Sequence, residues 1–111
     1  MSPARSKYMP LLVVEDGGLA TVSVVGESRE KAFVASSEDY IESMWLTDDT
    51  GAVANLVEGL FKYEGAETSM IIGRLPKGTY TPHALSNVHG VFDGAPVHNP
   101  HEQKFWKLSE L

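Results

Sequence analysis

Four histidines are the residues of this sequence best suited to metal binding or catalysis, and all lie in the last third of the chain. His98 and His101 are three residues apart and would share one face of a helix. A metal site would recruit His83 or His89, together with Asp93. Such a site suggests a small metal-dependent β-barrel enzyme with histidine ligands on adjacent strands. However, no His-x-His pair or nearby Glu at ligand spacing completes the pattern, and the proline between His98 and His101 favours a loop or helix cap.

Other catalytic motifs are missing from the sequence. The chain has no cysteine, which excludes a cysteine nucleophile, a disulfide scaffold and thiolate zinc sites. It contains no G-x-S-x-G elbow, no Gly-rich phosphate loop and no H-E-x-x-H motif. Asp48 and Asp49 are adjacent carboxylates, but adjacency in a turn suits capping better than acid–base catalysis. We therefore expect no catalytic activity and no bound metal or cofactor.

The segment from Trp45 to Val53 predicts the tip of a β-hairpin. An apolar run ends in Asp48-Asp49-Thr50-Gly51. Asp at the start of such a turn caps the backbone, and Gly at its end accepts a left-handed conformation. The sequence therefore predicts a strand, a tight turn and a second strand that begins at Ala52.

Residues 52–63 are ambiguous between strand and helix. Their apolar side chains fit the helical repeat at five positions, which are Val53, Leu56, Val57, Leu60 and Phe61. In contrast, Gly51 and Gly59 each weaken a helix by roughly 1 kcal/mol relative to Ala. We expect a third strand followed by a short helix, and the alternative is an α+β fold with a helix at about 50–64.

Length and composition indicate a single globular domain. The chain has 111 residues, of which 42% are hydrophobic and 22% are charged. We expect a flexible tail at 1–9 and one domain at 10–111, with no membrane span because no long apolar run occurs. The net charge of −6 argues against strong autonomous nucleic-acid binding. The lack of cysteine is compatible with a nuclear or cytoplasmic location.

The order of strand and turn signals along the chain resembles the OB-fold of single-strand-binding proteins. The likeness is to the small subunits of replication protein A and to the small OB-fold subunit of the RecQ helicase–topoisomerase III complex. The matching segments are Val24–Glu27, Leu46–Val53, Met70–Leu75 and 93–111. The resemblance implies a mainly β protein, a five-stranded OB-like barrel with a short helix after strand 3 and a C-terminal helix at 100–110.

The resemblance also implies where single-stranded DNA would bind. OB-folds bind oligonucleotides on strands 2 and 3 and on the loops that join strands 1–2 and 4–5. Basic side chains fall in or beside these loops, and two aromatic residues near the second strand would stack on bases or pack in the core: Arg29, Lys31, Arg74, Lys77, Phe33 and Trp45. Acidic residues around the same surface would repel phosphate, so at most weak DNA contact is expected.

The C-terminal helix is the expected partner-binding element. Phe105, Trp106 and Leu108 would anchor it to a larger protein subunit, or the helix would cover one end of its own barrel. The sequence thus suggests a small non-catalytic accessory subunit of a genome-maintenance complex. Two alternatives stay open: a small metal-dependent β-barrel enzyme that uses the histidines, and a protein-only interaction or viral protein of unrelated α+β fold.

Overall fold

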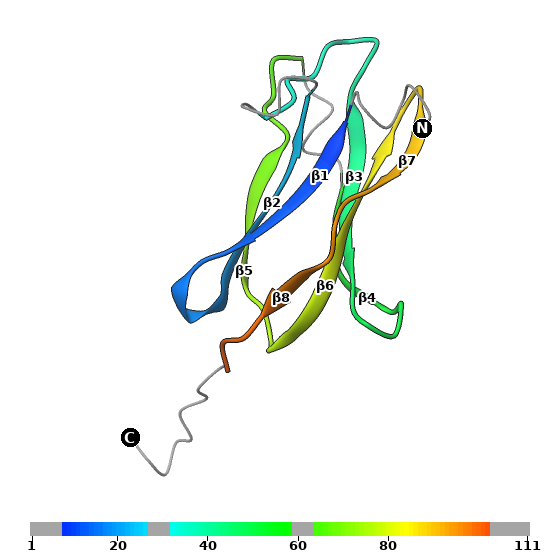
Figure 1. Ribbon diagram of the computed structural model, residues 1–111. Helices are drawn as coiled ribbons and strands as arrows, with labels where there is room; N and C mark the ends of the chain where they lie inside the picture. Colours follow the sequence, from blue (N-terminus) through cyan, green and yellow to red (C-terminus); the bar gives the residue numbers. More distant parts are fainter. Residues whose placement is uncertain (1–7, 27–31, 59–63, 103–111) are drawn as a thin grey trace.

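A computed structural model describes residues 8–26, 32–58 and 64–102 of the chain (Figure 1). This part of the protein is built almost entirely of strands. They are β1 (Met9–Val14), β2 (Leu19–Val25), β3 (Ile41–Thr47), β4 (Val53–Glu58), β5 (Ser69–Arg74), β6 (Gly78–Ser86), β7 (Gly90–Asp93) and β8 (Val97–Asn99), with a short 3₁₀ helix η1 (Asp16–Gly18) after β1. None of the described segments forms a helix of the length and apolarity needed to cross a membrane.

The strands form two antiparallel sheets. The small sheet has the order β1-β2-β5, and the large sheet has the order β4-β3-β6-β7, with β8 also paired to β6. Figure 1 shows the two sheets face to face, with β1, β2 and β5 in one layer and β3, β6 and β7 in the other. The segment between Val25 and Ile41 carries the chain from one layer to the other.

The expected five-stranded OB-like barrel is therefore wrong in its architecture, although the prediction of a mainly β protein is confirmed. In the described residues no strand closes the two sheets into a barrel. The physical reason lies in strand pairing. β3 pairs with β4 and β6, and β2 pairs with β1 and β5. The backbone hydrogen bonds of each central strand are therefore made within its own layer.

The predicted hairpin at Asp48-Asp49-Thr50-Gly51 is confirmed. It joins β3 to β4, with Trp45 opposite Leu56, and Gly51 has a φ of 86°. The alternative of a helix at about 50–64 is wrong over Val53–Glu58, which is strand. β4 carries apolar residues on both of its faces, with Leu56 beside Trp45 and Val57 beside Met44. In the sequence this distribution has the same spacing as the apolar face of a helix, which is why a helix was considered. The short helix expected after this strand falls at 59–63, outside the described residues.

The expected C-terminal helix at 100–110 is not seen in the residues that the structure describes. Pro100, His101 and Glu102 follow β8 without helical structure. The side chain of Asn99 is fully buried and donates hydrogen bonds to the carbonyl oxygens of Leu75 and Pro76, at 2.9 and 3.1 Å. Asn99 therefore anchors this end of the strand. The remainder of the predicted helix, with Phe105, Trp106 and Leu108, lies outside the described residues.

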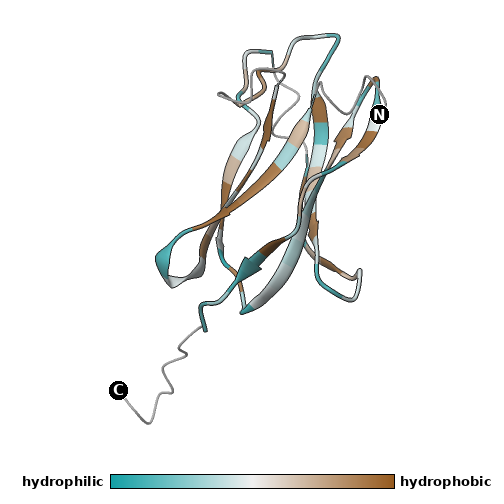
Figure 2. Ribbon diagram, viewed as in Figure 1, coloured by the Kyte–Doolittle hydropathy of each residue, from teal (hydrophilic) through white to brown (hydrophobic). Residues whose placement is uncertain are grey.

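The core lies between the inner faces of the two sheets. Alternation along β2 and β3 buries one side of each strand, and Figure 2 shows hydrophobic residues along the strands and hydrophilic ones at the turn between β1 and β2. Tyr8 sits at one end of this core, 1% exposed, with its ring edge-on to Phe33 and Phe92. Its hydroxyl donates to the carboxylate of Asp39. The buried cluster is made of Tyr8, Leu12, Ala20, Val22, Val24, Ile41, Met44, Leu46, Leu75, Tyr80, Ala84 and Phe92.

Gly94, directly after β7, lies where the two layers are in close contact. Its N–H donates to the carbonyl oxygen of Pro82 on β6, at 2.8 Å. A Cβ added to Gly94 would overlap the carbonyl oxygen of Pro10 on β1 and would lie 2.8 Å from Pro82 Cγ. Only a residue without a side chain fits between these two strands.

We predict that Gly94→Ala destabilises the protein by roughly 1–3 kcal/mol, because the new methyl group must push the two layers apart. Urea unfolding followed by circular dichroism measures this change. Gly26→Ala is the matched control, since a Cβ there meets no atom of the described residues within 4 Å. Equal stability of the two variants would contradict the close contact at Gly94.

A second prediction concerns Asp48 in the hairpin turn. Its Oδ1 accepts hydrogen bonds from the hydroxyl and N–H of Thr50, at 2.6 and 2.9 Å, and from the N–H of Ala52 at 3.1 Å. These bonds, those from Thr50 above all, favour the charged carboxylate and hold the pKa of Asp48 below its ordinary value of 3.8. The stabilisation is therefore complete above about pH 4 and is lost as pH falls through the lowered folded-state pKa.

Asp48→Asn should accordingly lower the melting temperature at pH 7, and the difference from the unsubstituted protein should shrink as the pH falls below about 4. Thermal unfolding between pH 2 and pH 7 measures it. Asp49→Asn removes the same charge from the neighbouring residue, whose carboxylate accepts no recorded hydrogen bond among the described residues, and it should have little effect. A difference that grows at low pH would contradict the assignment.

Candidate functional site

The candidate site lies on the outer face of the large sheet. Along β6, Tyr80, Pro82 and Ala84 are buried, so the alternate residues of this strand face outward. The register places Leu56, Trp45, His83 and Asp93 side by side on neighbouring strands β4, β3, β6 and β7. We call these four residues the lateral row. The histidine therefore stands in the middle of the sheet, with neighbours on both sides.

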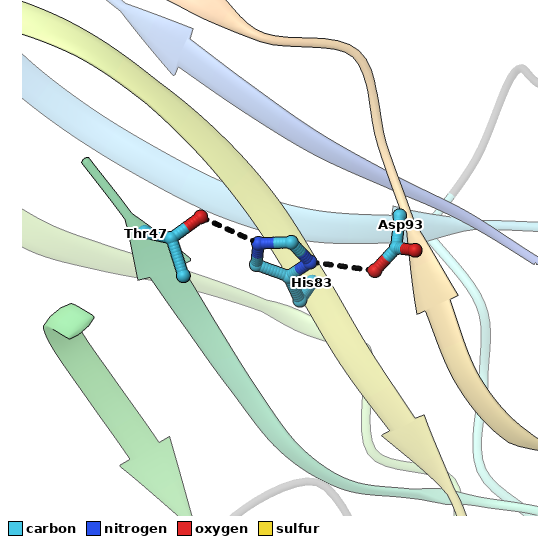
Figure 3. Close-up of polar contacts among 3 residues, drawn as sticks. All are labelled: Thr47, His83 and Asp93. Atoms are coloured by element: carbon cyan, nitrogen blue, oxygen red, sulfur yellow. Dashed lines mark hydrogen bonds and ion pairs between the residues drawn. The ribbon is translucent and has the colours of Figure 1, made fainter. Parts of the chain in front are cut away.

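Both ring nitrogens of His83 make short hydrogen bonds (Figure 3). Nδ1 lies 2.6 Å from Oδ1 of Asp93, and Nε2 lies 2.7 Å from Oγ1 of Thr47. A carboxylate only accepts hydrogen bonds, so Nδ1 must carry the proton. In the neutral ring Nε2 is then the acceptor, and the Thr47 hydroxyl donates to it. The arrangement is a hydroxyl, an imidazole base and a carboxylate that orients the base.

The surroundings of His83 hold its ring in place. The ring stacks on the indole of Trp45, with centroids 5.4 Å apart and planes 19° from parallel. Its side chain is only 15% exposed, whereas that of Asp93 is 67% exposed. The imidazole is therefore fixed on one side by an aromatic surface and at both nitrogens by hydrogen bonds. The carboxylate of Asp93, in contrast, is open to solvent.

The histidines do not gather into the metal site considered from the sequence. His83 and Asp93 are together, but His89 packs beside Tyr8, with ring centroids 5.7 Å apart. His98 instead has Nδ1 3.0 Å from Oγ1 of Thr79, and His101 follows β8. Among the described residues no group of three or more histidine, aspartate or glutamate side chains is placed to hold a metal ion.

Four of the residues expected to bind nucleic acid belong to the described part of the chain, where they lie in different segments. Phe33 packs against the core at Tyr8, and Trp45 belongs to the lateral row. Arg74, at the end of β5, donates from Nη1 to the carbonyl oxygen of Gly17 at 2.8 Å, and Lys77 pairs with Glu102 at 3.7 Å. Arg29 and Lys31 are outside the described residues. The four described side chains thus make their contacts in separate segments of the fold, and the predicted nucleic-acid site stays a prediction from the sequence.

Thr47 was not predicted to be a site residue, and His83 was considered only as a metal ligand. The signal that would have found the pair is alternation: Trp45 and Thr47 share one face of β3, and Thr81 and His83 share one face of β6. The partnership of β3 with β6, which brings these faces together, is not visible in the sequence.

Comparison with known proteins identifies the fold. No family model and no curated protein matches the chain. Among solved structures, a superoxide reductase from Nanoarchaeum equitans matches with a TM-score of 0.58 at 17% identity, covering 85% of this chain and 94% of that one. A superoxide reductase (neelaredoxin) from Archaeoglobus fulgidus, in the reduced form, has a TM-score of 0.55 at 17% identity, with 92% and 95% of the two chains covered. One from Ignicoccus hospitalis has a TM-score of 0.58 at 12% identity, with 92% and 87% covered. The chain has the fold of these proteins over nearly its whole length.

These matches correct the functional predictions made from sequence. The resemblance to small subunits of replication protein A and to the RecQ-associated OB subunit is wrong, and with it the role of an accessory subunit in DNA replication or repair. The expectation of a protein without catalytic activity is also contradicted, because the solved structures that share the fold include superoxide reductases, which are enzymes. The alternative of a small metal-dependent β-barrel enzyme that uses the histidines agrees better with these matches than the accessory subunit does.

The described residues do not form a complete redox metal centre of the kind that the name superoxide reductase implies. One-electron chemistry is carried by a bound metal or other cofactor. The chain has no cysteine to supply a thiolate, and in its described part only Asp93 accompanies His83. Zinc sites, for comparison, use three or four protein ligands. In the part of the chain that the structure describes, the shared fold is therefore not accompanied by a recognisable ligand set.

We predict that Thr47 and His83 are energetically coupled. A double-mutant cycle with Thr47→Val and His83→Ala should give a coupling free energy of about 0.5–1.5 kcal/mol, the usual range for a hydrogen bond of this kind. Chemical unfolding of the four proteins measures it. The exposed pair Thr79 and His98 is the matched control and should give a smaller value. Coupling no greater than in the control would show that the bond in the site is not maintained in solution.

Proposed function

We propose that this protein is a small enzyme whose catalytic residues are Thr47, His83 and Asp93, and that it hydrolyses activated esters. The observation that carries the proposal is the pair of short hydrogen bonds on opposite sides of one imidazole, at 2.7 and 2.6 Å. A hydroxyl within reach of a base that is itself oriented by a third group is the arrangement used in nucleophilic catalysis. The structural neighbours support the assignment to an enzyme, though not this reaction.

Each residue has a defined part in the reaction. Thr47 Oγ1 attacks the carbonyl carbon of the ester while its proton passes to Nε2 of His83. Asp93 holds Nδ1–H and stabilises the imidazolium that forms, and the proton then goes to the leaving alcohol. A water molecule repeats the sequence, with His83 again as the base, and releases the acid and free Thr47.

The test is the hydrolysis of p-nitrophenyl acetate by the purified protein. His83→Ala and Thr47→Val should each lower kcat/KM by roughly 10²–10⁴-fold, because they remove the base and the nucleophile. His98→Ala is the matched control: this histidine is exposed, also bonded to a threonine hydroxyl, and should leave the rate unchanged. Mass spectrometry of the quenched reaction should find an acetyl group on Thr47. Equal rates for His83→Ala and His98→Ala would overturn the proposal.

The names of the structural neighbours favour a second candidate, reduction of superoxide at a bound metal. One feature is compatible with it: a carboxylate that holds Nδ1–H of a histidine is the usual support of a metal-bound Nε2. The other ligands are not found among the described residues. Elemental analysis of the purified protein decides between the candidates. Metal at one equivalent that is lost in His83→Ala supports the redox enzyme, whereas metal-free protein that hydrolyses the ester supports the first candidate.

A further inference from the structure

Strand β4 forms one edge of the large sheet. It pairs with β3 and with no other described strand, so the backbone groups on its far side are not used in the sheet. Val53 is 62% exposed and Leu56 is 54% exposed. Six residues of extended chain with exposed apolar side chains are a ready template for one more strand.

The other edges of the described sheets are protected from such pairing. Natural edge strands are guarded by proline, by charge, by irregular backbone or by shortness. β1 contains Pro10, and β5 contains Gly73, with a φ of 95°, followed by Arg74. β7 has only four residues and β8 only three. β4, by comparison, has no proline, no glycine and no basic residue, and its one charge is Glu58 at its end. Its one irregularity is a register shift between Val53 and Asn55, which leaves Asn55–Glu58 regularly paired with β3.

The hairpin that carries this edge, and the segment before it, are acidic and lack basic residues. From residue 32 to residue 58 the sequence has no lysine or arginine, but it has six acids: Glu38, Asp39, Glu42, Asp48, Asp49 and Glu58. Asp49 lies at the turn before β4 and Glu58 at its far end, and both are exposed. The edge is therefore apolar in the middle and negative at both ends.

We propose that the free edge of β4 binds an extended basic peptide segment of a partner protein, which adds to the large sheet as a strand. Backbone hydrogen bonds to β4 would supply the affinity, as in other complexes formed by strand addition. Apolar side chains of the peptide would cover Val53 and Leu56, and lysine or arginine at its two ends would face Asp49 and Glu58. This binding site is separate from the lateral row's His83 and Asp93 and does not depend on the proposed catalysis.

A second copy of this chain fits the same edge poorly. In an antiparallel pair of β4 strands, Glu58 of each copy would approach the turn of the other, where Asp48 and Asp49 lie. Like charges placed opposite each other across strands are destabilising. The net charge of −6 adds a general repulsion between copies. A basic partner removes both penalties.

The experiment uses the full chain and a synthetic peptide of alternating valine and threonine with two lysines at each end. Fluorescence anisotropy of the labelled peptide should show saturable binding at low salt that weakens about ten-fold or more in 0.5 M NaCl. Asp49→Lys combined with Glu58→Lys should weaken binding about ten-fold or more at low salt. Glu15→Lys combined with Asp16→Lys is the matched control, with the same change of charge at the exposed turn after β1, and it should have a much smaller effect.

A second peptide tests for strand pairing as distinct from simple charge attraction. N-methylation of every other backbone amide keeps the side chains and charges but removes the hydrogen bonds of one strand edge, so binding should be lost. Absence of binding by the unmodified peptide, equal binding of the methylated peptide, or an equal effect of the two double variants would each overturn the proposal. Dimerisation of the protein that is abolished by the Asp49 and Glu58 variant would assign the edge to a second copy instead.

Discussion

Strand β6 pairs with β3, β7 and β8, and its register fixes both the core and the candidate site. Tyr80, Pro82 and Ala84 point into the space between the layers, and the residues between them point out. A slip of one position would bury His83 and expose Ala84. The burial of the inner residues therefore selects the alignment that brings His83 between Thr47 and Asp93. No additional structural element is needed to form the site, because the hydrophobic effect that packs the two sheets together also places the polar residues on the outer face.

Local features of this fold follow from sequence, whereas the pairing of distant strands does not. The turn at Asp48 and Gly51 was predictable because side-chain capping and positive φ are properties of adjacent residues. The choice between strand and helix after Val53 was harder, since an edge strand with apolar residues on both faces has no clean alternation. The pairing of β3 with β6 brings together residues far apart in the sequence, such as Thr47 and His83, which are 36 positions apart. It depends on which layers can bury their apolar faces together, and no local signal encodes that. The barrel prediction was wrong because the pairing of β3 with β6 was not predicted. Thr47 was not identified as a site residue for the same reason.

The likeness to superoxide reductases is one of architecture. It extends over most of the chain, but at 17% identity or less in the three structures described it does not carry the chemistry with it. The positions of the histidines agree with this conclusion. His89 packs beside Tyr8, whereas His83 lies on the outer face of the large sheet beside Trp45, so the two do not form one site. A framework of two sheets held by their inner faces leaves the outer residues free to change, and different side chains on it can support different reactions.

The close contact at Gly94 ties the candidate site to the packing between the layers. Gly94 directly follows Asp93 and donates to the carbonyl oxygen of Pro82, next to His83. A side chain at this position would overlap the carbonyl oxygen of Pro10 on the opposite layer. The residue that follows the orienting carboxylate is therefore restricted by the interior of the protein, although the carboxylate itself lies on the outer face. A larger residue at position 94 would disturb the packing of the layers and the backbone beside Asp93 at the same place.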